Sequence, residues 1–195
     1  MGHREDLLVG ALRCLTERGY ARTTARDIVA ASGTNLASIG YHFGSKDALL
    51  YEALMAIFDQ WGDQIDVATA DDDASPLERF GSMFGSIVAS FANGHEMLVA
   101  SIEVMAQAER VPQIREHFRD DYEQAREELA ASVLADAEPV DDESARAVGS
   151  FVLALLNGLA LQWMIDPERA PSGADMVTAL RVLAGREASA AGDGS

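Results

Sequence analysis

The chain has 195 residues, of which 48% are hydrophobic and 24% are charged, with 15 Lys and Arg against 32 Asp and Glu. The apolar fraction is large enough for a substantial core and excludes a wholly disordered chain. A formal net charge of −17 argues, as a sum, against a nucleic-acid-binding protein, because such proteins usually contain a basic domain.

The charge is unevenly distributed along the chain. Residues 1–50 carry six basic and five acidic side chains, whereas residues 51–195 carry nine basic and 27 acidic ones. The net charge is therefore +1 in the first part and −18 in the second. A phosphate backbone would repel only the second part, so the first fifty residues are the candidate for contact with DNA.

The cysteine content and the N-terminal residues indicate in which cellular compartment the protein is expected. The single cysteine, Cys14, cannot form a disulfide within the chain, which fits a reducing environment. The opening residues, MGHREDLL, carry charges where a signal peptide needs an apolar stretch. We therefore expect a cytoplasmic protein.

Four helices are predicted in the first sixty residues. The first ends at Gly19, and the second follows a capping-box pattern in which Thr24 can accept a hydrogen bond from the amide of Asp27. A Ser-Gly break at Gly33 ends the second helix, and Asn35 can cap a short third one. Gly44 then separates the third helix from a longer fourth helix.

Longer helices are predicted downstream, and no segment shows the sustained alternation of a β-strand. Acidic connectors that contain proline separate these helices. They are expected at residues 76–92, 95–109, 112–136, 142–165 and 173–187. Residues 188–195 are small and polar and are expected to form a disordered tail. The sequence thus predicts an all-α chain.

Two short helices joined by a tight, glycine-containing turn are typical of a helix-turn-helix motif, whose second helix enters the major groove of DNA. Residues 23–50 read TTARDIVAASGTNLASIGYHFGSKDALL, which resembles the signature of the tetracycline-repressor (TetR) family of bacterial regulators. The resemblance extends over residues 4–60. The sequence departs from the family pattern at Thr34 in the turn and at Gly40, where the family often has a phosphate-binding tyrosine.

The resemblance implies about nine helices in two domains. Residues 1–50 would form an N-terminal three-helix DNA-binding domain with the helix-turn-helix motif at 24–43, and residues 51–187 a larger ligand-binding and dimerisation domain. Such a protein would bind double-stranded operator DNA as a homodimer. The resemblance favours a repressor over an activator, and a small-molecule effector would release this repressor from its operator.

The resemblance also implies a set of DNA contacts. Thr24 with the first amides of its helix would bind a phosphate, and so would Lys46 at the start of the fourth helix. Arg22 and Arg26 are either solvated helix charges or further phosphate ligands. The predicted DNA-binding residues are Thr24, Thr34, Asn35, Leu36, Ala37, Ser38, Tyr41, His42 and Lys46.

The predicted recognition helix contains neither Arg nor Lys, so it lacks the commonest reader of guanine. We therefore expect base readout through Asn35 and Ser38, supported by DNA shape. Leu36 and Ala37 would add methyl contacts. Tyr41 and the following His42 would reach the DNA backbone or an adjacent base. Alternatively, Tyr41 would pack within the protein, and His42 would be an ordinary residue at the end of its helix.

Residues 147–165 contain no charged side chain and are long enough to cross a bilayer. Their acidic flanks and internal polar residues favour a helix that is buried in a core or between two subunits. With an apolar stripe on the last helix, this segment would form a four-helix bundle across a two-fold axis. The predicted interface residues are Val148, Phe151, Val152, Leu155, Leu156, Leu159, Met176, Leu180 and Leu183.

The middle helices would surround a pocket for an unknown small-molecule effector, as the resemblance implies. Methionine and aromatic side chains at helical spacing supply the candidates, although such residues are also typical of an ordinary core. The candidates are Trp61, Phe84, Ile87, Phe91, Met97, Ile102, Met105, Phe118, Tyr122 and Trp163.

The sequence does not indicate an enzyme. The four histidines, at positions 3, 42, 95 and 117, lack metal-ligand spacing, and no glycine-rich phosphate loop is present. The carboxylates of Asp120 and Asp121 fit a solvated helix face. We expect no metal and no other cofactor. Two alternatives stay open, namely an acidic helical adaptor that binds proteins without specific DNA binding, and a membrane-anchored regulator.

Overall fold

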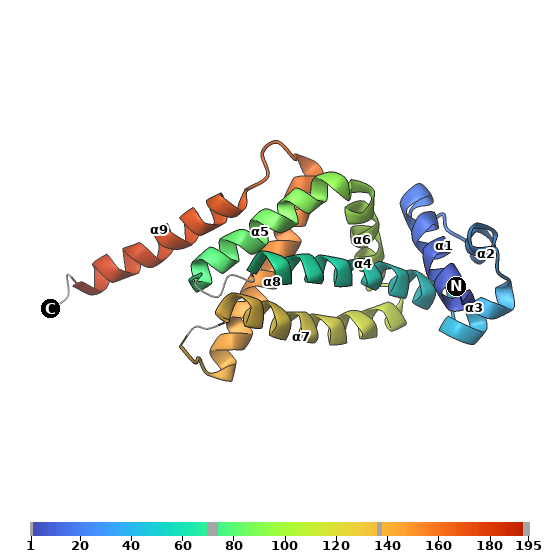
Figure 1. Cartoon of the computed structure of the whole chain (residues 1–195), viewed down its shortest axis with the longest axis horizontal. Coiled ribbons are helices and arrows are strands. Elements are labelled where there is room, and N and C mark those ends of the chain that lie inside the picture. Colours follow the sequence, from blue (N-terminus) through green and yellow to red (C-terminus); the bar gives the residue numbers. More distant parts are fainter. Residues whose placement is uncertain (1, 70–73, 136–137, 193–195) are drawn as a thin grey trace. The chain divides into compact units, whose positions relative to one another are not determined.

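The computed structural model describes residues 2–69, 74–135 and 138–192, without the side chains of residues 57, 59–69, 93 and 186–192. Within these residues the backbone forms nine helices and no strand, so the predicted all-α class is confirmed (Figure 1). The helices are α1 (His3–Arg18), α2 (Ala25–Ser32), α3 (Leu36–Phe43), α4 (Lys46–Thr69), α5 (Pro76–Asn93), α6 (His95–Gln107), α7 (Pro112–Leu134), α8 (Asp142–Ile165) and α9 (Gly173–Gly192).

The last helix, α9, is longer than the sequence predicts. It continues to Gly192, past residue 187, after which a disordered tail is expected. Three of the five residues from 188 to 192 are alanine, which has the highest helix propensity of all residues. The backbone of these five residues is therefore helical, and residues 193–195 lie outside the described part of the chain.

The chain divides into two compact units. The first unit contains Met1–Gly62 and Gly94–Glu123, and the second contains Asp63–Asn93 and Gln124–Ser195. In the first unit α6 packs against α1, so helices from both sides of residue 50 share one core. The functional boundary at residue 50 stays a prediction, since it concerns which residues contact DNA.

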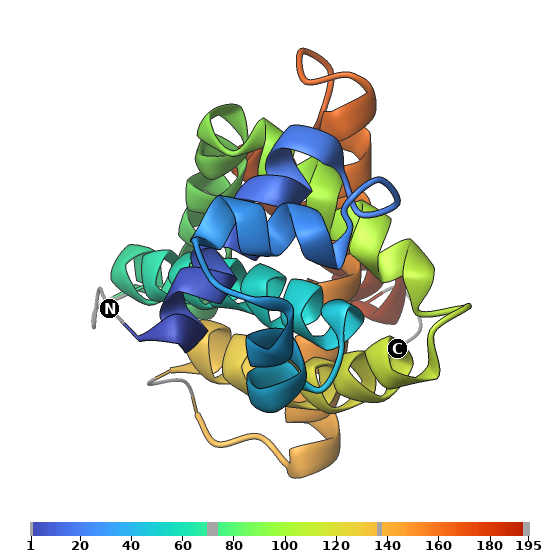
Figure 2. The ribbon, with the colours of Figure 1, turned by 90° about the vertical axis from the view of Figure 1, so that its right-hand side faces the viewer.

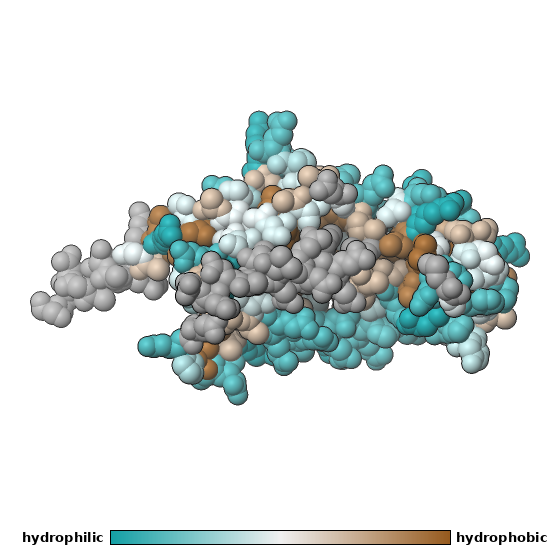
Figure 3. Space-filling view, viewed as in Figure 1, coloured by the Kyte–Doolittle hydropathy of each residue, from teal (hydrophilic) through white to brown (hydrophobic). Residues whose placement is uncertain are grey.

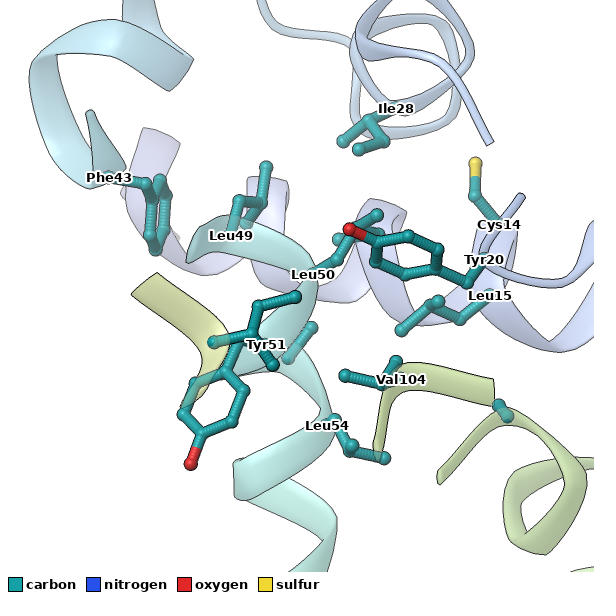
Figure 4. Packing of buried hydrophobic residues seen from close by; sticks show 14 of the residues in the cluster. Cys14, Leu15, Tyr20, Ile28, Phe43, Leu49, Leu50, Tyr51, Leu54 and Val104 are labelled. Atoms are coloured by element: carbon teal, nitrogen blue, oxygen red, sulfur yellow. The ribbon is translucent and has the colours of Figure 1, made fainter. Parts of the chain in front are cut away.

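One hydrophobic core joins the helices of the first unit. Figure 4 shows side chains from α1, α4 and α6, among them Leu15, Leu50 and Val104, that point into this core. The core also holds Ile28 of α2 and Ile39 of α3, so the short helices are anchored to α1. Its buried members are Leu7, Ala11, Cys14, Leu15, Tyr20, Ile28, Ile39, Phe43, Leu49, Leu50, Tyr51, Ala53, Leu54, Ala100, Val104, Ile114 and Phe118.

The acidic pair on α7 is only partly a solvated face. The lower edge of Figure 3, where α7 runs in the same view of Figure 1, is hydrophilic, and Asp120 of α7 is exposed. Asp121, however, accepts a hydrogen bond from the hydroxyl of Tyr51, a buried residue of α4. Burial and this hydrogen bond raise the pKa of Tyr51. Asp121 thus joins α7 to α4 within the first unit.

In the second unit α5 packs against α8 and α9. The buried ring of Phe91 on α5 lies 5.7 Å from the ring of Trp163 on α8. α8 also approaches α7 closely at Gly149, where a Cβ would lie 2.7 Å from the carbonyl carbon of Arg126. Glycine at this position is therefore what allows the backbones of α7 and α8 to lie so near each other.

The long apolar helix α8 has two apolar faces. The first, with Val152, Leu159 and Trp163, is buried within the chain. The second carries Phe151, 45% exposed, and Ile165, 79% exposed. We call this second row the outer stripe of α8, and its members recur at intervals of four and three residues: Ala147, Phe151, Ala154, Gly158, Leu161 and Ile165.

The two faces change the predicted dimer interface. Val152 and Leu159, which the sequence places in that interface, are 1% and 0% exposed, so intrachain packing already occupies their side chains. Periodicity could not separate the two faces, because α8 is apolar nearly all round. Phe151 on α8 and Leu183 on α9 are exposed and stay candidates for a contact with a second copy.

α8 is also long and apolar enough to cross a membrane, by length and composition alone, and within the described residues it is the one helix of this kind. A single such helix is weak evidence for a membrane span, since the core helix of a soluble protein can meet the same criteria.

Candidate DNA-binding site

The second helix begins with the predicted capping box. The Thr24 hydroxyl accepts a hydrogen bond from the Asp27 N–H at 3.2 Å, and the Asp27 carboxylate accepts one from the Thr24 N–H at 2.9 Å. Asp27 also pairs with Arg18 of α1 at 2.7 Å. These interactions, above all the hydrogen bond with the Thr24 side chain, lower the pKa of Asp27. The start of α2 is thereby held against α1, and Thr24 itself is exposed.

Replacing Thr24 by Val should lower the free energy of unfolding by about 1 kcal/mol at neutral pH, because the N-cap of α2 is lost. The folded-state pKa of Asp27 lies below its ordinary value of 3.8. The stabilisation from the ionised Asp27 is therefore fully present above pH 3.8 and is lost as the pH falls through the folded-state pKa. The difference in the free energy of unfolding between wild type and variant, measured with urea, should therefore shrink as the pH is lowered below 4.

The matched control is Thr178→Val, at an exposed threonine inside α9. Its effect on stability should not depend on pH in this range. The role of the box would be contradicted if the difference in the free energy of unfolding between wild type and Thr24→Val stayed constant down to the lowest pH at which the protein folds.

The turn between α2 and α3 has the conformation that the motif needs. Gly33 has φ 68° and ψ 19°, in the left-handed region that favours glycine. Asn35 then caps α3, because its side-chain oxygen accepts a hydrogen bond from the Ser38 N–H at 3.1 Å. Figure 2 gives a second view of α1, α2 and α3, drawn in blue. The short helices therefore form as predicted, each with its own cap.

α3 exposes a mainly apolar surface. We define the α3 face as its exposed residues with their cap: Asn35, Leu36, Ala37, Gly40 and Tyr41. Leu36 is 51% exposed and Tyr41 is 86% exposed, so neither side chain contributes to the core. Leu36, Ala37 and Tyr41 are thus available for the DNA contacts that the sequence predicts. A packing role for Tyr41 within the chain is not supported, given its exposure.

Two other predicted contacts already have polar partners within the chain, and a third is half-buried. Ser38 is only 9% exposed, and its hydroxyl lies 3.5 Å from Nδ1 of His3. The Thr34 hydroxyl lies 2.7 Å from that of Ser32. His42 is half-buried, and its ring meets the ring of Tyr41 edge-on. Ser38 therefore does not count among the residues available to base edges.

Lys46 is held by three groups of its own unit. Its Nζ donates to the carbonyl of Thr23 at 3.1 Å and lies 3.3 Å from the Asp47 carboxylate. The same ammonium lies 4.9 Å from the ring centre of Tyr20. A phosphate contact by Lys46 therefore requires the ammonium to share or leave these partners.

Arg26 is an exposed cation in the first turn of α2. No hydrogen bond or ion pair engages Arg26 within the part of the chain that the structure describes. By contrast, Arg22 donates to the carbonyl of Arg18 at 2.7 Å, and Arg4 pairs with Glu52. Of the two arginines that the sequence leaves undecided, Arg22 has a hydrogen bond to a backbone carbonyl, and Arg26 has none within the described residues.

Comparisons with known proteins agree with this geometry. Residues 7–53 match the family model of bacterial regulatory proteins of the tetR family. Residues 76–186, more than half of the chain, match the model of the C-terminal part of BetI-type transcriptional repressors. The chain belongs to the TetR family. The resemblance noted in the sequence is thereby confirmed.

Individual TetR relatives match over different lengths. The HTH-type transcriptional repressor KstR2 of Mycobacterium tuberculosis is 32% identical over 96 residues, which are 49% of this chain and 48% of KstR2. The match therefore spans about half the length of that relative. The probable HTH-type transcriptional regulator ArpR of Pseudomonas putida is 25% identical over 182 residues, or 85% of this chain and 81% of ArpR.

A solved structure shows the same fold. The TetR transcription regulator from Haloarcula marismortui has a TM-score of 0.67 at 23% identity, and the match covers 96% of this chain and 97% of that chain. The likeness shows that this chain shares the fold of that regulator.

The residues predicted to line an effector pocket in this TetR-family chain are divided between the two units. Met97, Ile102, Met105, Phe118 and Tyr122 lie in the first unit. The second unit contains Phe84, Ile87, Phe91 and Trp163. The side chain of Trp61 lies outside the described residues. The pocket stays a prediction.

α6 connects one group of candidate pocket residues with the DNA-binding helices. The Tyr122 hydroxyl donates to the sulfur of Met105 at 3.6 Å. Two residues before Met105, the Glu103 carboxylate accepts a hydrogen bond from the Tyr20 N–H at 2.6 Å, in the turn between α1 and α2. Sequence reasoning missed Glu103, because a contact between residues 83 positions apart leaves no local pattern.

A groove of about 350 Å³ lies between α5 and α9 in the second unit. None of the predicted pocket residues lines it. Its walls are formed by Leu77, Glu78, Gly81, Ser82, Gly173, Ala174, Val177, Thr178 and Arg181. Within the described ranges, no three His, Cys, Asp or Glu side chains are grouped so that they could hold a metal ion.

Proposed function

We propose that this TetR-family chain is a sequence-specific DNA-binding repressor that acts as a homodimer in the cytoplasm and leaves its operator when a small molecule binds. The α3 face carries the proposal, since it exposes large side chains on the second helix of a helix-turn-helix unit. The relative KstR2 is named a transcriptional repressor, and the matched C-terminal model is that of BetI-type repressors, which favours repression over activation.

On the DNA side, each subunit uses two elements. The exposed Thr24, the first amides of α2 and the exposed Arg26 bind phosphates. The α3 face enters the major groove beside them. The net charge of −18 beyond residue 50 keeps the rest of the chain away from the phosphates, so that only the near-neutral part docks.

The homodimer forms through the outer stripe of α8 in this proposal. Three large apolar side chains left exposed along one helix, Phe151, Leu161 and Ile165, are unusual for a monomer. The alternation of three- and four-residue intervals is the spacing with which helices pack against each other. A two-fold axis would bring two such stripes together. The apolar composition of α8 then needs no membrane.

The effector acts through α6 in this proposal. A small molecule that contacts Ile102 or Met105 shifts α6 and with it the Glu103 carboxylate, which holds the Tyr20 amide at the entrance to α2. The ligand-bound conformation then places the two α3 faces out of register with successive major grooves. The factor by which the ligand can lower DNA affinity is limited by the ratio of its affinities for the two conformations.

Selection of bound sequences from a pool of random duplexes tests the function. We expect enrichment of an inverted repeat whose half-sites lie about one helical turn apart. Absence of any enriched sequence at low salt would instead favour an acidic adaptor. A protein that is insoluble without detergent would favour the membrane-anchored alternative.

Arg26→Ala should weaken binding to operator and to random DNA by similar factors, since phosphate contacts carry no sequence information. With roughly 6–8 phosphate contacts per dimer, the log–log slope of affinity against salt should be about −5 to −7. Loss of two Arg26 contacts per dimer should make that slope shallower by about 2. Fluorescence anisotropy at several salt concentrations measures both effects.

Arg169→Ala is the matched control, because it removes the same charge from an exposed arginine of the second unit. It should leave the salt slope unchanged. Equal slopes for wild type and Arg26→Ala would exclude the phosphate contact of Arg26.

A further inference from the structure

We infer that the Asp47 carboxylate competes with a DNA phosphate for the positive charge of Lys46, and that the Tyr20 hydroxyl weakens this competition. The inference rests on the proposed function and identifies two residues that adjust the strength of one phosphate contact. It follows from the positions of these three side chains around the start of α4.

The ammonium of Lys46 lies beside the proposed phosphate site at the start of α2. Its Nζ donates to the carbonyl of Thr23 at 3.1 Å, and Thr23 directly precedes Thr24, the N-cap of α2. The Lys46 side chain is 29% exposed, so it is accessible from solvent. Lys46 can therefore contribute to a phosphate site at this place.

The Asp47 carboxylate is a second partner of this ammonium. Its Oδ1 lies 3.3 Å from Nζ of Lys46. An ammonium group has three N–H donors, so a phosphate oxygen can still find a donor, and the two anions compete for one positive charge. A carboxylate at this distance offsets part of the attraction between the ammonium and a phosphate, and it also repels the phosphate itself. Asp47 therefore weakens the contact of Lys46 with DNA.

Tyr20 binds the same carboxylate oxygen. Its hydroxyl donates to Oδ1 of Asp47 at 2.7 Å. Burial, and then the hydrogen bond with Asp47, raise the pKa of Tyr20, so the hydroxyl stays protonated and remains a donor. A hydrogen bond from a hydroxyl stabilises the negative charge of a carboxylate and weakens its interaction with other donors. Tyr20 thereby leaves more of the Lys46 charge to a phosphate.

The position of Tyr20 is fixed by its surroundings. The residue is 7% exposed, and its ring packs in the core of the first unit (Figure 4). Its N–H donates to the Glu103 carboxylate of α6 at 2.6 Å. The Tyr20 hydroxyl is therefore a fixed donor, whereas the side chains of Lys46 and Asp47 are partly exposed and can adjust when DNA binds.

A purely structural role of Asp47 would have a different consequence. Asp47 lies in the first turn of α4, where an acidic side chain interacts favourably with the helix dipole. If this were its only role, Asp47→Asn would lower the melting temperature and leave the affinity for DNA unchanged. Competition for Lys46 instead predicts that the same substitution raises the affinity for DNA.

Fluorescence anisotropy with labelled duplexes tests the inference. Asp47→Asn should raise the affinity for operator and for random DNA alike, because phosphates carry no sequence information. The gain should be about 2- to 30-fold for a dimer, in which two partly exposed ion pairs are removed. Tyr20→Phe keeps the ring and the N–H but removes the hydroxyl, and it should lower the affinity roughly two-fold. In the presence of Asp47→Asn, the effect of Tyr20→Phe should disappear.

A third variant separates competition for Lys46 from simple repulsion. When Lys46→Ala is also present, the gain from Asp47→Asn should be smaller, because only the direct repulsion between carboxylate and phosphate is then relieved. Asp120→Asn is the control for net charge, since it removes the same charge from an exposed position of the first unit. Tyr51→Phe is the control for Tyr20→Phe, because it removes another hydroxyl that donates to a carboxylate, that of Asp121. Neither control should change the affinity for DNA.

The possible failures are distinguishable. A wild-type protein that binds no DNA at low salt would refute the proposed function itself. If the wild type binds DNA, an unchanged or lower affinity of Asp47→Asn would overturn the competition and leave the function intact. An equal gain from Asp47→Asn with and without Lys46 would overturn it as well, since Asp47 would then act by repulsion alone. An unchanged or higher affinity of Tyr20→Phe would overturn the role of the Tyr20 hydroxyl.

Discussion

Phe151→Asp should leave the chain monomeric at micromolar concentration and lower its operator affinity by about 10²–10⁴-fold. The substitution places a carboxylate in the outer stripe of α8, where a partner helix would bury it without a counter-charge. Loss of the dimer separates the two DNA-binding units, and each half-site is then bound singly. Size-exclusion chromatography with light scattering measures the mass, and anisotropy measures the affinity.

Val140→Asp is the control for exposure and for charge. Val140 is 48% exposed, close to the 45% of Phe151, but it precedes α8 and lies outside the outer stripe. This variant should remain dimeric and bind the operator as the wild type does. A Phe151→Asp protein that stays dimeric with unchanged circular dichroism would exclude the outer stripe as the interface.

Gly149→Ala should destabilise the protein by about 3 kcal/mol, the upper part of the range for overpacked sites. The new methyl group would collide with the backbone carbonyl of Arg126, and a backbone group cannot rotate away as a side chain can. For a chain of this size the melting temperature should fall by about 6–12 °C. Thermal unfolding followed by circular dichroism measures the shift.

Gly85→Ala is the matched control in α5. A Cβ at Gly85 would meet no atom within 4 Å, and the residue is exposed. Alanine has the higher helix propensity, so this variant should be more stable than the wild type by about 0.5–1 kcal/mol. Equal melting temperatures for wild type and Gly149→Ala would show that α7 and α8 can separate at little cost.

The local structure of the DNA-binding unit could be predicted from the sequence because its signals are local. The box formed by Thr24 and Asp27, the left-handed Gly33 and the cap at Asn35 each depend on residues no more than three positions apart. Such patterns depend on backbone hydrogen bonds that any short helix needs at its ends. The existence and order of the helices followed from them.

The accessibility of individual contacts could not be predicted in the same way. Ser38 and Ala37 are neighbours in the chain, yet Ser38 is buried while Ala37 is exposed. Lys46 stands where the family signature implies a phosphate ligand, but Thr23, Asp47 and Tyr20 already hold its ammonium. The direction of each side chain depends on which side of a short helix packs on α1, and both sides of α3 contain apolar residues.

By itself, the sequence determined the all-α class, the helix-turn-helix unit with its caps, the family, and the division of charge at residue 50. These properties reside in propensities, short-range hydrogen bonds and composition, which do not depend on the rest of the fold. Only the tertiary structure decided which face of α8 is buried and that Glu103 of α6 reaches the turn before α2. The second is a hydrogen bond to a single atom, and the first depends on which neighbours an apolar helix has. Such choices are made when the helices pack together, and no local pattern records them.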